Sequence, residues 1–119
     1  MRAGAKADDM NPTIDPTVFA ELQDSAGAEF VAELVDTFRA EAPQMLAELR
    51  DALAAGSAER FRRAAHSLKS NANTFGAAAL GSAARDLELA GLPTDAAAID
   101  ALDALYAQAA AALAELCRG

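Results

Sequence analysis

The stretch that decides the fold is RRAAHSLKSNANTFG, residues 62–76, which contains His66, the only histidine of the chain. At helical spacing, the apolar residues of this region fall within about 40° either side of one line: Phe61, Ala65, Leu68, Ala72 and Phe75. Its polar residues lie roughly 80–180° away from that line: Arg62, His66, Lys69, Ser70 and Asn73. The pattern predicts an amphipathic helix whose histidine faces solvent, with a cation one turn before it and another one turn after it.

These residues resemble the motif of histidine-containing phosphotransfer (HPt) domains, which is Ala-His-x-Leu-Lys-Gly followed by a large apolar residue and a glycine. The chain has Ala65-His66-Ser67-Leu68-Lys69-Ser70, followed by Phe75-Gly76. Ser70 departs from the family's glycine but is still small, so the space over the imidazole is expected to stay open. The resemblance extends more loosely from Ile14 to Gly91. It implies an imidazole that takes a phosphoryl group from one receiver-domain aspartate and gives it to another.

Size and composition favour one helical domain. The 119 residues suffice for a single core, and the absence of Trp and abundance of Ala and Leu favour close-packed helices over sheets. The net charge of −8 argues against nucleic acid and anionic membrane surfaces, because both attract clustered Lys and Arg. With one cysteine, Cys117, and one histidine, neither an internal disulfide nor a zinc site made of protein ligands is expected. No metal or cofactor of its own is therefore predicted.

The start of the chain predicts no targeting segment. Residues 1–12 lack helical periodicity and carry charges of both signs, so we expect a disordered tail there and a single domain over residues 13–119. The longest apolar runs fall short of a membrane span. We therefore expect a cytoplasmic protein.

Capping signals divide the rest of the chain into helices. Asp15-Pro16 begins a short helix that ends near Gly27 and is expected to cover one end of the core. A long helix follows and ends at Gly56, a glycine suited to a left-handed cap. Inside it, the ring of Pro43 would clash with the carbonyl of Arg39, which predicts a kink or a break between them.

The histidine helix follows Ser57 and ends at Gly76, where the chain reverses into a helix that stops at Gly91. The last helix is predicted to start at a Thr94 cap. Short connections between helices of this length make neighbours antiparallel. The prediction is an all-α monomer: an antiparallel four-helix bundle with a short additional N-terminal helix.

The apolar positions of the long helix span about 160°, wider than packing against one partner helix requires. Either this helix is buried between two neighbours, or one edge, formed by Val31 and Val35, stays exposed for a partner protein. The sequence leaves both alternatives open.

The chemistry expected at His66 is nucleophilic attack by a neutral imidazole nitrogen on a phosphoryl group. Lys69, one turn away, is best placed to stabilise the phosphoryl oxygens. If the chain reverses near Gly76, position 66 lies opposite Glu88, which could fix the tautomer of the imidazole. A salt bridge between Glu88 and Lys69 is the alternative, and the two contacts can coexist.

The resemblance implies that the partners are receiver domains of a hybrid histidine kinase and of a response regulator, with Mg²⁺ bound by the receiver. Such a partner would approach over Arg62, Arg63, Ser70 and Asn73, although Arg63 and Asn73 could equally be ordinary solvated residues.

Two other functions compete with this one. A phosphate-independent helical adaptor would use the wide apolar face of the long helix and would not need His66. The phosphoacceptor helix of a sensor kinase has His-Glu-x-Arg/Lys-x-Pro, whereas this chain has Ser67 and Asn71 at the acidic and proline positions. We therefore expect a phosphohistidine carrier that is neither an autonomous kinase nor a phosphatase.

Overall fold

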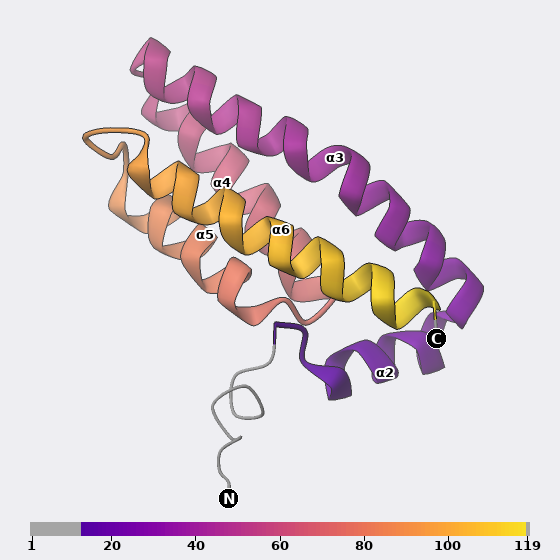
Figure 1. The fold of residues 1–119 in the computed structure, drawn as a ribbon. Helices are drawn as coiled ribbons and strands as arrows, with labels where there is room; N and C mark the ends of the chain where they lie inside the picture. Colours follow the sequence, from indigo (N-terminus) through magenta and orange to yellow (C-terminus); the bar gives the residue numbers. More distant parts are fainter. Residues whose placement is uncertain (1–12, 119) are drawn as a thin grey trace, which may run out of the picture.

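The computed structural model describes residues 13–118, so the tail expected at residues 1–12 lies outside the described residues. Four long helices form an antiparallel bundle, and a short helix lies across one end of it (Figure 1). The predicted fold is therefore confirmed. The helices are α2 (Pro16–Ala26), α3 (Ala28–Ala55), α4 (Ala58–Thr74), α5 (Ala78–Ala90) and α6 (Ala97–Arg118).

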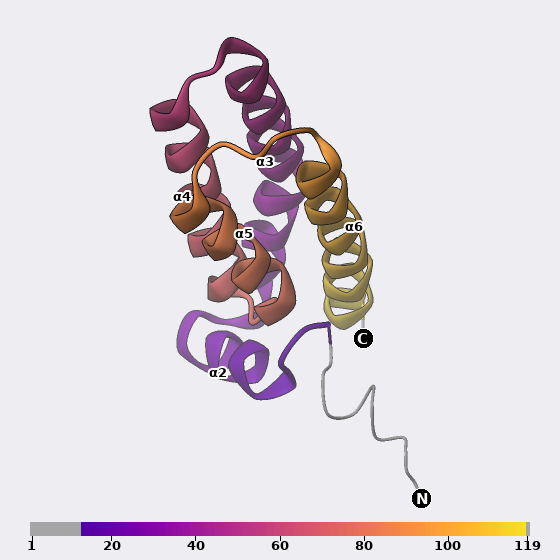
Figure 2. The same ribbon diagram turned by 90° about the vertical axis from the view of Figure 1, so that its left-hand side faces the viewer.

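The order of the helices around the bundle leaves one side of α4 uncovered. α4 packs against α3 and α5, and α6 packs against the same two helices from the other side (Figure 2). α4 and α6 are therefore diagonal to each other. The core between the four helices is built from large apolar side chains that are almost fully buried, among them Phe38, Phe61, Leu68, Leu80 and Leu102.

Both valines that the sequence offered as an exposed edge of α3 are buried. Val31 and Val35 belong to the main core cluster, so the prediction that they contact a partner protein is wrong. The reason is that α3 packs against both α4 and α6, and against α2 as well. At Val31 and Val35, the wide apolar arc of α3 is thus covered by neighbouring helices.

Pro43 does not break α3, which runs without interruption from Ala28 to Ala55. Because proline has no N–H, the carbonyl of Arg39 loses the donor that a regular helix would supply. The hydroxyl of Tyr106 in α6 donates to that carbonyl instead, at 3.1 Å. Tyr106 therefore joins α6 to α3 at the turn that contains Pro43.

The last helix begins later than predicted. α6 starts at Ala97, and Asp95 is the residue whose side chain accepts a hydrogen bond from its first turn, at 2.9 Å from the Ala97 nitrogen. Thr94 lies in the preceding connection and does not cap the helix.

α6 also reaches the length and mean hydropathy of a membrane-spanning helix, with a value of 1.2 in its most apolar window. The apolar runs considered in the sequence had not indicated this. Core helices of bundles meet the same criterion, and α6 buries Ile99, Leu102 and Leu113 against its neighbours while Asp100 pairs with Arg50 of α3. Its composition is therefore weak support for a membrane segment.

Gly76 reverses the chain after α4, as predicted, and it also holds α2 in place. Its φ of +79° lies in the left-handed region, and its carbonyl accepts a hydrogen bond from the Asp15 nitrogen at 2.8 Å. A Cβ at this position would lie 3.0 Å from Cβ of Val18 and 3.1 Å from the Asp15 carbonyl oxygen. The glycine is therefore needed both for its backbone conformation and for the close approach of α2.

Replacing Gly76 with alanine should lower the free energy of unfolding by about 2–4 kcal/mol, because left-handed strain and overpacking against α2 add together. Gly56→Ala is the matched control, since Gly56 has a φ of +69° with nothing within 4 Å of its missing Cβ. That variant should lose only about 1–2 kcal/mol. Urea denaturation of both variants measures the difference. Equal losses of unfolding free energy would show that overpacking against α2 does not destabilise the Gly76→Ala variant.

Candidate functional site

The helix that carries His66 is fixed at its start and along its inner face. The Ser57 side chain caps it by accepting a hydrogen bond from the Arg60 nitrogen, and Arg60 pairs with Glu48 of α3 through contacts of 2.8 and 3.0 Å. Phe61, Ala65 and Leu68 are buried, as the periodicity predicts. The His66 side chain is 56% exposed, so the prediction that it faces solvent is confirmed.

Glu88 of α5 contacts both His66 and Lys69, each through a different oxygen. Nδ1 of His66 lies 2.8 Å from Oε2 of Glu88, and Nζ of Lys69 lies 2.9 Å from Oε1. The two contacts that the sequence offered as alternatives for Glu88 are both confirmed, and they coexist. The glutamate therefore links the histidine to the lysine one turn further along α4.

Glu88 is placed to act as a hydrogen-bond acceptor for the imidazole. Lys69, and after it His66, hold the pKa of the Glu88 carboxyl below its usual value. The contribution of this carboxylate to the stability of the fold is fully present at pH values above the ordinary carboxyl pKa. It is lost as the pH falls through the lowered pKa of the folded state. An ionised carboxylate only accepts hydrogen bonds, so in the neutral imidazole the proton sits on Nδ1. Nε2 is then the nitrogen with a free lone pair.

A second contact between α4 and α5 lies two helical turns from the first. Asn73 occupies the space where Gly81 lacks a side chain, because a Cβ on Gly81 would overlap the Asn73 amide oxygen. Asn73 and Gly81 are each seven residues away from His66 and Glu88, which places both pairs in one antiparallel register. Gly81 was not predicted from the sequence as a contact residue, although an isolated glycine inside a helical pattern can indicate such a close approach.

The other residues predicted to meet a partner share the solvent-facing side of α4. Arg62, Arg63, Ser70 and Asn73 are all exposed. Within residues 13–118, no ion pair involves Arg62 or Arg63. Their charges are therefore open to solvent near His66, although the chain as a whole carries a net charge of −8.

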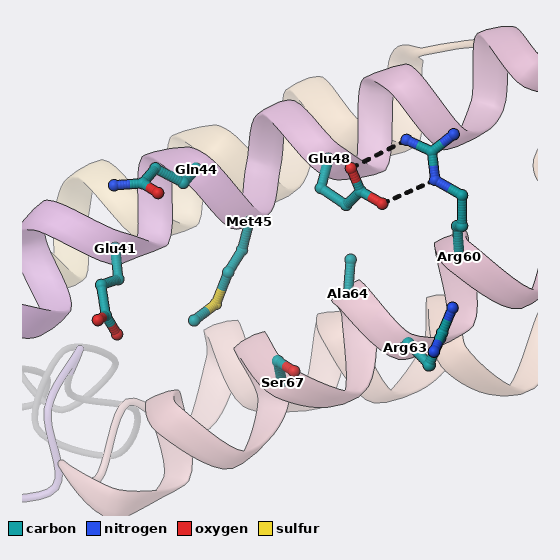
Figure 3. Close-up of a pocket in the computed structure, with 8 residues that line it drawn as sticks. All are labelled: Glu41, Gln44, Met45, Glu48, Arg60, Arg63, Ala64 and Ser67. Carbon is teal, nitrogen blue, oxygen red and sulfur yellow. Dashed lines mark hydrogen bonds and ion pairs between the residues drawn. The ribbon is translucent and has the colours of Figure 1, made fainter.

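A groove of about 390 Å³ lies between α3 and α4 (Figure 3), and Glu88 is not among the residues that line it. Met45 and Ala64 contribute apolar surface, and the Glu48–Arg60 pair joins its two walls. His66 does not line this groove, so it is not a substrate pocket for the imidazole. Its lining residues are Glu41, Gln44, Met45, Glu48, Arg60, Arg63, Ala64 and Ser67.

No other chemical centre is evident in the part of the chain that the structure describes. Over residues 13–118, His, Cys, Asp and Glu side chains form no group of three that could hold a metal ion. Cys117 is partly buried at the end of α6, and burial raises the pKa of its thiol. A raised pKa disfavours the reactive thiolate.

An exposed imidazole, held by a carboxylate on the side of a four-helix bundle, is the arrangement of a histidine phosphotransfer protein. Residues 33–112 match the family model of the Hpt domain, and the chain belongs to this family. Its structure is similar to that of histidine-containing phosphotransfer protein B (HptB) from Pseudomonas aeruginosa PAO1. The TM-score is 0.82 at 29% identity, over 90% of this chain and 96% of that one. No curated protein matches the chain.

Membership of this family gives the general function. Hpt domains take part in phosphorelays together with receiver domains, and they are generally carriers of phosphoryl groups rather than autonomous enzymes. The chain is therefore a histidine phosphotransfer protein of a phosphorelay.

Proposed function

We propose that His66 accepts a phosphoryl group from the receiver aspartate of a hybrid sensor kinase and passes it to the receiver of a response regulator. The observation that carries this proposal is the 2.8 Å contact between Nδ1 of His66 and Glu88, made by a histidine that is otherwise open to solvent. In the neutral imidazole this contact leaves the Nε2 lone pair free, on a side chain that is more than half exposed. The protein would act in the cytoplasm. It would act as a monomer, since one imidazole suffices for each transfer.

In the proposed step, the Nε2 lone pair attacks the phosphorus of an aspartyl phosphate. The bond between phosphorus and the aspartate oxygen breaks, and the aspartate leaves as a carboxylate with the bonding electron pair. Positive charge then develops on the ring, which keeps its proton on Nδ1, and the Glu88 carboxylate 2.8 Å away stabilises it. In the second transfer the ring leaves as neutral imidazole, because Nδ1 has kept its proton throughout.

Lys69 would stabilise the negative charge on the phosphoryl oxygens from the side of this chain. The receiver's Mg²⁺ would stabilise the negative charge on the receiver's side of the transferring group. In the present structure the Lys69 ammonium is paired with Glu88. A dianionic phosphoryl group on Nε2 would compete for that ammonium, since it lies one turn from the histidine. Arg62, Arg63, Ser70 and Asn73 would lie under the receiver.

The orienting role of Glu88 can be separated from its salt bridge with Lys69. Glu88→Ala removes the acceptor from Nδ1, so the ring should populate both tautomers and transfer should slow by about 10- to 100-fold. Losing the orienting partner of a metal-ligating histidine has effects of that size. Glu88→Gln is the control, because its amide oxygen can still accept from Nδ1. Nitrogen NMR of the ring reports the tautomer. A normal transfer rate in Glu88→Ala would show that Glu88 does not orient the imidazole and only forms a salt bridge with Lys69.

Transfer itself is the direct test of the proposed function. A receiver domain labelled on its aspartate is mixed with this chain, and the label is followed on both proteins. A carrier takes up the label without ATP and releases it to a second receiver. A phosphate-independent adaptor would bind the receiver but acquire no label, and that result against every receiver of the source organism would refute the proposal.

A further inference from the structure

An interface that forms and breaks during a relay needs an apolar contact as well as charges. One of the two alternatives drawn from the sequence placed that contact at Val31 and Val35, but both are buried. Within residues 13–118, three large apolar side chains are exposed: Phe30, Leu89 and Leu116. Exposed leucines are ordinary on protein surfaces, so exposure alone does not indicate a contact with a partner. The position of an exposed apolar side chain relative to His66 is what can indicate such a contact.

Leu89 lies close to the level of His66 along the axis of the bundle. It follows Glu88, which contacts His66, and neighbouring residues of a helix are about 1.5 Å apart along its axis. Leu89 is therefore at nearly the same level of the bundle as His66. Leu87 packs against the core and Glu88 faces α4, so the next position around α5 points to solvent, and Leu89 is 69% exposed.

The other two exposed side chains lie elsewhere. Phe30 is near the start of α3 and Leu116 near the end of α6, both at the end of the bundle where α2 lies (Figure 1). α6 is also diagonal to α4 (Figure 2). Neither residue can share a surface centred on His66 as directly as Leu89 does.

A docked receiver would cover Leu89. Each partner of a specific interface typically buries about 800 Å², which corresponds to a patch reaching about 16 Å from its centre. Neighbouring helices are only about 8–10 Å apart, so a patch centred on His66 extends across the outer side of α5. Arg85, one turn before Leu89, is exposed and makes no ion pair within residues 13–118. Together with Arg62 on α4, it gives the outer side of the hairpin positive charges beside the exposed carboxylate of Asp86.

We propose that Leu89 is an apolar contact for the receiver domain on the α5 side of His66, in an interface that spans both helices of the α4–α5 hairpin. This inference rests on the proposed transfer between His66 and a receiver. It assigns to α5 a share of the partner surface in addition to its support of the imidazole through Glu88.

The test is single-turnover transfer from a phosphorylated receiver at increasing receiver concentration, with Leu89→Ala. The half-saturating concentration should rise about 5- to 10-fold, as for truncation of a contributing interface side chain. The maximal rate should stay unchanged, because Leu89 does not touch the reacting atoms. Leu116→Ala is the matched control and should behave like the wild type. Both variants should keep the wild-type melting temperature, since the side chains are exposed.

Three results would overturn the inference: unchanged half-saturation in Leu89→Ala, equal changes in both variants, or a lower maximal rate at unchanged half-saturation. The last would mean that Leu89 acts through Glu88 rather than on the receiver. Failure of the proposed function is distinguishable from all three, because the wild-type chain would then take up no label at any receiver concentration.

Discussion

His66→Ala will abolish acid-labile phosphorylation of the chain and leave its fold intact. His66 is the only histidine in the sequence, so no second imidazole can replace it as an acceptor. The side chain is more than half exposed and contributes no core contact, so the free energy of unfolding should change by less than about 0.5 kcal/mol, apart from the loss of its bond to Glu88. Transfer from a labelled receiver and urea denaturation measure the two effects.

Ser67→Ala is the appropriate control for that experiment. Ser67 is the neighbouring exposed side chain and the nearest hydroxyl in the sequence, so it would be the first candidate for stray labelling. Its loss should leave the labelling unchanged. If His66→Ala still acquired an acid-labile label from a receiver, the imidazole would not be the acceptor, and the assignment of the site would be wrong.

The site could be predicted from the sequence because its determinants are local. Helical periodicity separates His66 from the buried stripe of Phe61, Ala65 and Leu68, and this depends on no distant contact. The placement of Glu88 required only one further assumption, an antiparallel reversal at Gly76. Once the reversal is fixed, the register of the hairpin brings position 88 to position 66.

Apart from the local choice of Thr94 rather than Asp95 as a helix cap, the errors concern contacts between elements that are distant in the sequence. The wide arc of α3 fits either an exposed edge or burial from several sides, and only the placement of α2 and α6 shows that Val35 is buried. The bond from Tyr106 to the Arg39 carbonyl joins α6 to α3. No periodicity along one helix reports such a pair. The same holds for Gly81. A glycine is needed at this position because the Asn73 side chain of the neighbouring helix occupies the space that a Cβ would fill.

Ser70→Trp will block phosphoryl transfer without unfolding the bundle. Ser70 is one helical turn after His66 on the same exposed side of α4, where the family motif has a glycine. The receiver must bring its aspartyl phosphate within about 3–3.5 Å of Nε2 and in line with it. An indole beside the imidazole would occupy that approach, and misplacement by about 1 Å already costs on the order of 100-fold in rate. We therefore expect a fall of at least about 100-fold.

Ser25→Trp separates obstruction from any general effect of a large aromatic side chain. Ser25 is an exposed serine near the end of α2, the short helix that lies across one end of the bundle (Figure 1), so this variant should transfer at the wild-type rate. Both variants should melt within a few degrees of the wild type, because neither serine is buried. A normal transfer rate in Ser70→Trp would mean that the receiver does not cross this side of α4. Since Nε2 can be reached only from the side on which His66 is exposed, the in-line geometry proposed for the transfer would then be wrong.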